Sequence, residues 1–241
     1  MIKVTIYNEY LHEQTEPAIK NVYPKGIHGA LQQNLTDDEI SIIATVTADT
    51  IELLTDELLK NTDVLLWWGH IGHDRVPDEI AKRVQYRTLC GMGMIFLHSG
   101  HHSKPFKLLM GTSCNLQWRE QGDSELVWVV DPSHPIAKGI DRYFRLEHEE
   151  TYSEPFSIPK PEELVFIGRY SGGEVFRSGC CYKREYGKIF YFQPGHESFP
   201  TYYNPDVIKV LKNAIHWAVA DVRVEDLTCP MIEPLGEDII K

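Results

Sequence analysis

Short, unbroken apolar runs alternate with segments of helical periodicity through the first half of the chain. The strand candidates are residues 3–7, 41–46, 63–68 and 93–98. The helix candidates between and after them are residues 17–35 (interrupted at Pro24 and Gly26), 55–60, 77–89 and 103–110. A strand that is apolar at every position must be covered on both faces, which indicates a parallel sheet flanked by helices. The alternating order favours a doubly wound α/β sheet.

The second half of the chain has the pattern of antiparallel strands followed by one helix. Strands are predicted at residues 125–130 and 163–170, and a hairpin joins 175–182 to 188–193. An amphipathic helix follows at about 206–219, and the tail 223–241 has no clear period. No long linker or repeat is present, so we expect one domain over residues 1–241 with its core at about 3–220. The tail is expected to pack on that domain or on a neighbouring subunit.

Composition narrows the function classes. Hydrophobic residues make up 42% of 241 residues, enough for a sizeable core, and the formal net charge is -11. That charge and the scattered basic residues disfavour nucleic acid as a partner. The apolar runs are too short to span a bilayer, and the first residues do not resemble a signal peptide. Five cysteines without CxxC spacing argue against disulfides, so we expect a cytoplasmic protein with buried thiols.

Seven of the eleven histidines follow predicted strands. They are His12 after the first strand, His70 and His73 after the third, His98, His101 and His102 at and after the fourth, and His196 after the hairpin strand. In an open parallel sheet, ligands bind beyond the carboxyl ends of the strands. We therefore expect these rings to surround one cavity. We interpret His28, His134 and His216, which lie in helical or turn-like stretches, as structural.

Converging imidazoles and carboxylates have two main uses. One is a divalent metal site, most simply zinc, with His12, His70, His102 and His196 as ligand candidates. The other is metal-free acid/base catalysis. No HExxH motif decides between them. In the segment 147–152, Glu150 is the acid/base candidate, whereas Glu147 and Glu149 are interpreted as parts of a solvated loop.

Ser99 supports a different hypothesis, a metal-free hydrolase. It lies between an apolar strand and a helix, as a nucleophile does, and His196 with Glu197 would complete a triad. The local sequence is HSGHH instead of GxSxG. The alternative is that Ser99 caps the helix or hydrogen bonds a ligand.

Aromatic residues motivate a third hypothesis, a non-catalytic sugar-binding or regulatory protein. The aromatics near the predicted edge are Trp67, Trp68, Trp118, Tyr10, Tyr152, Tyr202 and Tyr203. Trp67 and Trp68 lie within one strand, so one is expected to pack on each face. The substrate-binding candidates are Glu9, Tyr10, Tyr152 and Tyr202.

The chain resembles the ThuA family of trehalose-utilisation proteins from about residue 3 to residue 220. The resemblance is carried, in order, by KVTIYNEY, LTDELLKNTDVLLWWGHIGHDRV, GMGMIFLHSGH, HPIAKGI, HEETY and YGKIFYFQPGHE. It implies a flavodoxin-like three-layer sandwich with a mostly parallel sheet, similar to class I glutamine amidotransferases. It also implies a role in carbohydrate catabolism. The small-molecule partner would then be trehalose or a related disaccharide, including an oxidised derivative.

Amidotransferases of that fold have a catalytic cysteine at the nucleophile elbow, the sharp turn that follows a central strand. They also have a histidine and a glutamate that are separated by one intervening residue. Here the elbow carries His98-Ser99, and His196 and Glu197 are adjacent. The departures predict that amidotransferase activity is absent, because a fold can be inherited while its chemistry changes. The hairpin and the tail are the segments we expect in a homo-oligomer contact.

Overall fold

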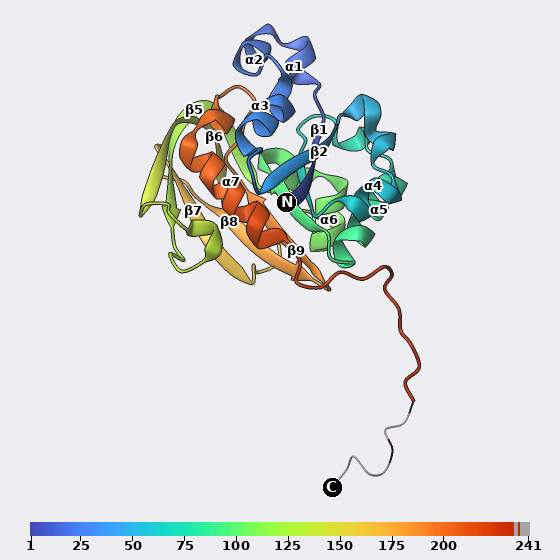
Figure 1. The fold of residues 1–241 in the computed structure, drawn as a ribbon. Coiled ribbons are helices and arrows are strands. Elements are labelled where there is room, and N and C mark those ends of the chain that lie inside the picture. The colour runs from blue at the N-terminus through green and yellow to red at the C-terminus, as the bar shows by residue number, and fades with distance from the viewer. Residues whose placement is uncertain (234–235, 237–241) are drawn as a thin grey trace.

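A computed structural model describes residues 1–233 and residue 236 (Figure 1). Within these residues nine strands form one sheet in the order β2-β1-β3-β4-β9-β8-β7-β5-β6. The strands are β1 (Ile2–Asn8), β2 (Ile40–Val46), β3 (Val64–Trp68), β4 (Gly93–Leu97), β5 (Gln117–Val129), β6 (Tyr143–Ser153), β7 (Glu163–Tyr170), β8 (Val175–Arg184) and β9 (Gly187–Phe192). The fold is therefore mixed α/β, built on this nine-stranded sheet.

The sheet changes character at β9. Strands β2, β1, β3, β4 and β9 run parallel, whereas β8, β7, β5 and β6 continue it antiparallel. The expectation of a mostly parallel sheet therefore holds for the core only. The short connections from β7 to β8 and from β8 to β9 explain the antiparallel half of the sheet, because a hairpin can join only antiparallel strands.

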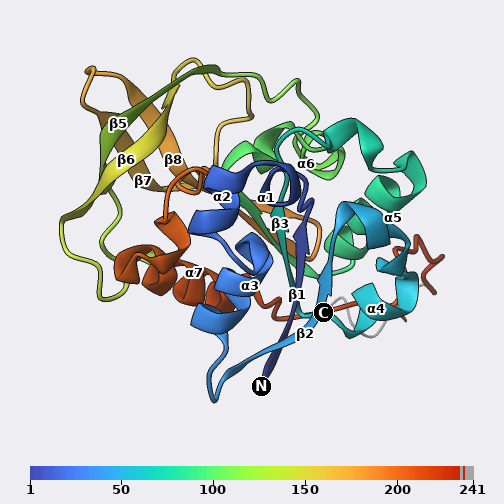
Figure 2. The same cartoon turned by 90° about the horizontal axis from the view of Figure 1, so that it is seen from above.

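Helices cover both faces of the sheet (Figure 2). They are α1 (His12–Thr15), α2 (Pro17–Val22), α3 (Gly26–Leu35), α4 (Asp56–Asn61), α5 (Asp78–Leu89), α6 (Lys104–Met110) and α7 (Pro205–Ala218). Helices α3 and α7 pack on one face, and α5 and α6 on the other. Successive side chains of β3 alternate between the faces, with Trp68 in the first cluster and Trp67 in the second. The expectation of one tryptophan on each face is thus confirmed.

Helix α7 illustrates how the sequence determines an element. The Asn204 side chain accepts hydrogen bonds from the backbone N–H groups of Asp206 and Val207, and Pro205 occupies the first turn. Its buried residues recur at helical spacing and face the sheet: Val207, Val210, Leu211, Ala214, Ile215 and Ala218. The observed helix agrees with the expected one to within a residue at each end.

One strand was absent from the sequence interpretation. Residues 147–152 form part of β6 instead of a solvated acidic loop, and Glu149 within it is fully buried. The charged sequence EHEETY concealed the strand, because its inward carboxylate is satisfied by hydrogen bonds that a hydrophobicity pattern does not reveal. The interpretation of Glu147 as solvated agrees with its 74% exposed side chain.

The first part of the tail packs on its own chain. Arg223 pairs with Asp63 at 2.9 Å, and the Val224 amide donates to the Cys90 carbonyl. From Cys229 to Glu233 the tail is exposed and leads away from the body (Figure 1). The expectation of packing therefore holds for the start of the tail, and residues 234, 235 and 237–241 lie outside the described residues. Cys229 is exposed, whereas the other four cysteines are buried.

No helix among the described residues is both long and apolar enough to cross a membrane.

Candidate functional site

Four histidines from four strand ends meet at the carboxyl edge of the parallel strands. His12 follows β1, His70 follows β3, His98 directly follows β4 and His196 follows β9. The ring centroids are 5.2 Å apart for His12 and His70, 5.5 Å for His70 and His196, and 5.3 Å for His98 and His196. Strands β1, β3, β4 and β9 are consecutive in the sheet, so their ends are neighbours. The structure thus brings together imidazoles that are far apart in the sequence.

A cavity of about 450 Å³ opens beside this cluster. It is lined by His70, Ile71, His73, Ser99, His101, His102, Asn115, Leu116, Trp118, Glu120, Glu150 and Tyr152. This volume lies within the range of small-molecule sites, about 300–1,000 Å³. The cavity is therefore large enough for a small organic substrate.

Glu197 lies at the centre of one group of potential ligands. Its Oε1 is 2.5 Å from His12 Nδ1 and 3.1 Å from His70 Nδ1. Burial opposes ionisation, but the two imidazoles hold the pKa of Glu197 well below its usual range. Glu197 in turn raises the pKa of His12. Two nitrogens thus share one carboxylate oxygen.

Two atoms of this group are buried without a hydrogen-bond partner in the described chain. They are His70 Nδ1, which is close to Glu197 but not aligned for a hydrogen bond, and Glu197 Oε2. Leaving a buried polar atom unpaired costs about 1–3 kcal/mol. Such unpaired atoms require an explanation. A cation that accepts a lone pair from His70 Nδ1 and another from Glu197 Oε2 would explain both.

His196 directs a ring N–H group toward Glu197. Its Nδ1 accepts a hydrogen bond from the Ser198 amide at 3.2 Å, so the proton of the neutral ring is on Nε2. Burial lowers the pKa of His196 to about 4, which keeps the ring neutral. Nε2 is 3.7 Å from Glu197 and 3.8 Å from Glu120, too far for hydrogen bonds. An uncommitted N–H donor therefore points into the site.

His98 and Glu150 form a buried ion pair. His98 donates from Nδ1 to the Gln193 carbonyl at 2.8 Å and from Nε2 to Glu150 at 2.9 Å. Both nitrogens face acceptors, so both carry protons. Burial opposes this charge, but Glu150 overrides it and raises the pKa of His98 to about 9. The same bond keeps the pKa of Glu150 low despite burial, so Glu150 is an ionised carboxylate at the cavity wall.

The sharp turn after β4 places its strain on His98 and not on Ser99. His98 has a φ of 49°, the left-handed conformation that a nucleophile elbow imposes on one residue. Ser99 Oγ instead donates to the Gly69 carbonyl at 2.9 Å. Glu197 contacts His12, so the triad Ser99-His196-Glu197 is not assembled. Ser99 does not cap the following helix either, because Ser103 does.

Two candidates for substrate contact are support residues. Glu9 is 1% exposed, and its two oxygens accept the Ile71 and Gly72 amides at 2.9 and 2.8 Å. It holds the loop that carries His70. Tyr202 is fully buried below the turn at Gly195, whose φ of 142° and contact with the Tyr202 hydroxyl leave no room for a Cβ. Neither side chain reaches the cavity.

The remaining candidates differ in position. Tyr152 lines the cavity and stacks on His98 at 4.9 Å, whereas Tyr10 packs against His28 and is not a lining residue. His102 lines the cavity but is exposed, 5.6 Å from the His73 ring, and it belongs to neither ligand group near Glu197. The structure therefore separates His102 from the other three ligand candidates.

Glu149 positions the turn that carries His196 and Glu197. Its carboxylate accepts the Gly195 and His196 amides, both at 3.0 Å, and the Thr201 hydroxyl at 2.9 Å. The sequence interpretation missed this role because a buried carboxylate in an acidic stretch has no pattern of its own. Trp68 assists from β3, with Nε1 donating to the Gly195 carbonyl at 3.0 Å.

Replacing Glu149 by glutamine is expected to lower the free energy of unfolding by about 3 kcal/mol, because an amide must face donors with its own N–H groups. Urea denaturation measures the effect. Glu147→Gln on the same strand is the matched control, because the Glu147 side chain is 74% exposed, and it should change stability by less than about 0.5 kcal/mol. Equal stability of the two variants would contradict the assigned role.

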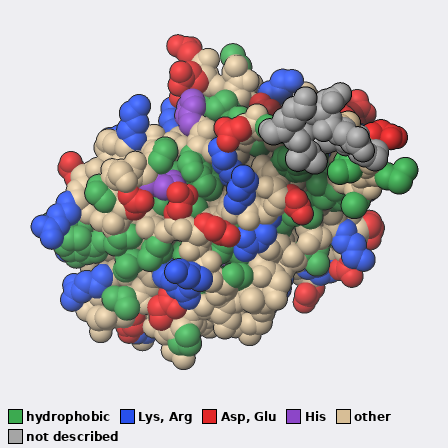
Figure 3. Space-filling model, turned by 90° about the horizontal axis from the view of Figure 1, so that it is seen from below, with side chains coloured by type: hydrophobic (Ala, Val, Ile, Leu, Met, Phe, Trp, Pro, Cys, Tyr) green, Lys and Arg blue, Asp and Glu red, His purple; other side chains and the backbone are tan. Residues whose placement is uncertain are grey.

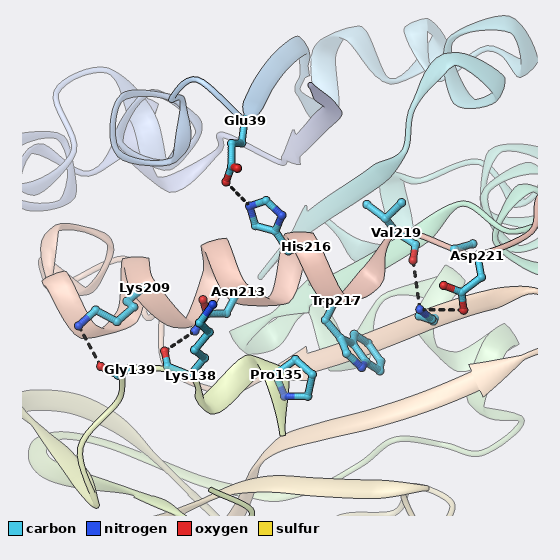
Figure 4. A pocket seen from close by; sticks show the side chains of 12 residues that line it. Glu39, Pro135, Lys138, Gly139, Lys209, Asn213, His216, Trp217, Val219 and Asp221 are labelled. Carbon is cyan, nitrogen blue, oxygen red and sulfur yellow. Dashed lines mark hydrogen bonds and ion pairs between the residues drawn. The ribbon is translucent and has the colours of Figure 1, made fainter. Parts of the chain in front are cut away.

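A larger pocket, of about 910 Å³, lies away from this edge, along α7 (Figure 4). Its polar groups are occupied with one another: His216 pairs with Glu39, and Lys209 donates to the Gly139 carbonyl. Lys188 is held by Asp221 and the Val219 carbonyl. No group of potential metal ligands among the described residues lines it, so size alone does not make it the functional site.

Acidic and basic side chains are interspersed on the face shown in Figure 3. That face has no continuous basic patch of the kind that binds nucleic acid.

Comparisons with known proteins identify the family and the fold. The profile of the ThuA family, described as trehalose utilisation, matches residues 3–218. No curated protein matches the chain in sequence. A ThuA-like protein from Parabacteroides merdae superimposes with a TM-score of 0.62 at 13% identity, over 94% of this chain and 92% of that one.

Two further solved structures have the same fold. A cytoplasmic protein from Salmonella typhimurium gives a TM-score of 0.62 at 12% identity, covering 92% of this chain and all of that one. A protein from Thermoplasma acidophilum, described as part of a GMP synthase, gives 0.55 at 15% identity, covering 90% and 93%. At such identities the likeness shows the fold alone.

Proposed function

The chain belongs to the ThuA family of trehalose-utilisation proteins, and from that premise we propose that it is a metal-dependent enzyme of carbohydrate catabolism. Its substrate is trehalose or a related disaccharide, including an oxidised derivative. Family membership supports the substrate class. The geometry at the carboxyl edge supports the metal.

One observation carries the proposal: His12 and His70 direct the same type of nitrogen at one carboxylate oxygen of Glu197. Two histidines and a glutamate with an open fourth position are a known catalytic zinc site. The unpaired His70 Nδ1 and Glu197 Oε2 fit this group, because a cation would accept both lone pairs. We therefore assign His12, His70 and Glu197 as zinc ligands. His196, a ligand candidate by sequence, has its proton on Nε2 and acts as a donor.

The protein groups around the ion have separate tasks. His12, His70 and Glu197 would hold the zinc ion, which would polarise a substrate oxygen or lower the pKa of a water molecule. Glu150, ionised at the cavity wall, accepts a proton from the substrate. His196 donates a hydrogen bond from Nε2 to an oxygen on which negative charge develops. His98 acts through Glu150 by holding it ionised and in place.

The hydrolase hypothesis is not retained, because Ser99 Oγ and His196 are not hydrogen bonded and Ser99 donates to Gly69. Amidotransferase chemistry is not proposed either, because the strained residue of the elbow is a histidine and not a cysteine.

We further propose that the architecture is a flavodoxin-like three-layer sandwich of the class I glutamine amidotransferase type. The parallel strands have the order 2-1-3-4-9, which corresponds to flavodoxin's 2-1-3-4-5. The similarity to the Thermoplasma protein supports it. The continuous sheet supports one domain, and the Salmonella protein described as cytoplasmic supports that location.

Metal removal tests the proposal. Protein dialysed against a chelator is expected to lose more than about 90% of its turnover of trehalose or its keto derivatives, and zinc should restore it. Chromatographic detection of products across a disaccharide panel is the measurement. The control is chelator plus excess zinc from the start. Full activity in protein shown by elemental analysis to be metal-free would contradict the metal assignment.

A further inference from the structure

A bulge in β5 shapes the mouth of the cavity. Residues 117–119 pair with 151–153 of β6, and pairing resumes only at Asp123 opposite Glu149. Residues 120–122 therefore stand opposite Glu150 alone. Bulges of this kind re-aim side chains and are common next to active sites.

The bulge is held firmly on the side away from the cavity. Asp123 accepts hydrogen bonds from Arg119, from the Thr151 hydroxyl at 2.9 Å and from the Ser171 hydroxyl at 2.6 Å. Arg119 also pairs with Glu174. Because neighbours on a strand point to opposite sides, this fastening leaves Trp118 and Glu120 facing the cavity, and both line it.

Trp118 and Glu120 are exposed although their backbone is fixed. Trp118 is 66% exposed, in contrast to the fully buried Trp67 and Trp68. The Glu120 side chain is 49% exposed, and its Oε1 is 3.8 Å from His196 Nε2. An indole left in solvent adds little to folding stability, so its placement on a paired strand at a cavity mouth points to a ligand.

The side chains of Trp118 and Glu120 indicate which class of ligand binds beside them. An indole face packs against the C–H face of a sugar ring, and a carboxylate accepts hydrogen bonds from adjacent hydroxyls. The lining residues include the carboxylates Glu120 and Glu150 and no lysine or arginine. Burial lowers the pKa of both His73 and His101 to about 3, so neither supplies positive charge. The mouth formed by Trp118 and Glu120 therefore brings no positive charge to a distal sugar ring, which disfavours a phosphate group on that ring.

We propose that Trp118 and Glu120 form a subsite for the non-reacting ring of an uncharged disaccharide. The inference rests on the proposed function and extends it. The distal ring stacks on Trp118, two of its hydroxyls donate to Glu120, and the other ring lies beside Glu150 and His70. These residues set the affinity for a second sugar unit and leave the reacting end unchanged.

Titration calorimetry with trehalose and glucose as probes tests the subsite. Trp118→Ala and Glu120→Gln are each expected to weaken trehalose binding about 10-fold, and to change glucose binding by less than about twofold. Tyr143→Ala and Glu147→Gln are the matched controls, an exposed aromatic and an exposed carboxylate on the neighbouring strand β6. Both controls should bind trehalose like the unmodified protein.

The outcomes separate the subsite from the proposed function. Unchanged trehalose binding in both variants would overturn the subsite and leave the enzyme proposal intact. An equal loss of glucose binding would also overturn it, because the pair would then hold the reacting ring. Weakened trehalose binding without any turnover by the unmodified protein would support the subsite and contradict the enzyme. Absence of sugar binding by the unmodified protein would overturn both.

Discussion

Replacement of His70 by alanine is expected to lower kcat/KM by about 10³-fold or more. His70 is the histidine common to both groups of potential ligands at this edge, one with His12 and Glu197 and the other with Glu150 and His196. Loss of residues that merely orient ligands costs about 10–100-fold, so loss of a ligand itself should exceed that range. Steady-state kinetics on the disaccharide that the panel identifies measure the effect.

His102→Ala is the matched control for this experiment. His102 lines the same cavity but lies outside both ligand groups. We expect its kcat/KM to remain within about threefold of the unmodified protein, because an exposed rim residue contributes little. If His70→Ala retained more than about a tenth of the activity, the role of His70 as a ligand would be wrong.

The second large effect is expected for Glu150→Gln. Glutamine has almost the same shape but cannot accept a proton, and general-base catalysis contributes about 10²–10⁴-fold. We expect kcat to fall by about 10³-fold with KM changed by less than about threefold. Single-turnover kinetics separate the chemical step from product release.

Glu147→Gln on the same strand controls for a general effect of removing a carboxylate, and it should leave kcat unchanged within about twofold. Circular dichroism of Glu150→Gln confirms that the variant is folded, which is needed because Glu150 is the partner of His98. A folded Glu150→Gln protein with normal kcat would remove Glu150 from the mechanism.

The sequence was sufficient to predict the convergence of the histidines. The runs before His70 and His98 are apolar at every position, so they had to be buried strands, and the ends of neighbouring parallel strands meet. His12, His70, His98 and His196 come together for that reason. Long-range contacts followed here from topology and not from any local motif.

The roles of individual residues at the site could not be predicted in the same way. Ser99 and His98 differ by one position, and only backbone geometry shows that the strained elbow residue is His98. Glu9 and Tyr202 lie next to the site in sequence, but their side chains point into the structure. The direction of a side chain after a strand depends on the backbone conformation of the turn, which a hydrophobic pattern does not reveal.

The antiparallel half was the least predictable part. Strand β6 carries an arginine at residue 145 and glutamates at 147, 149 and 150, which conceal its inward face. The β5 bulge at residues 120–122 breaks the period of two on which strand recognition depends, and residues 117–124 were not predicted as strand. Glu120 was therefore missed, although it lies only two residues from Trp118.

Zinc stoichiometry by elemental analysis is the most direct test of the imidazole cluster as a metal site. The purified chain, after dialysis against metal-free buffer, is expected to retain about one zinc ion, and a His12→Ala/His70→Ala protein should retain less than about a tenth of that. An unmodified, folded protein that binds no stoichiometric divalent ion, even after incubation with zinc, would contradict the metal centre.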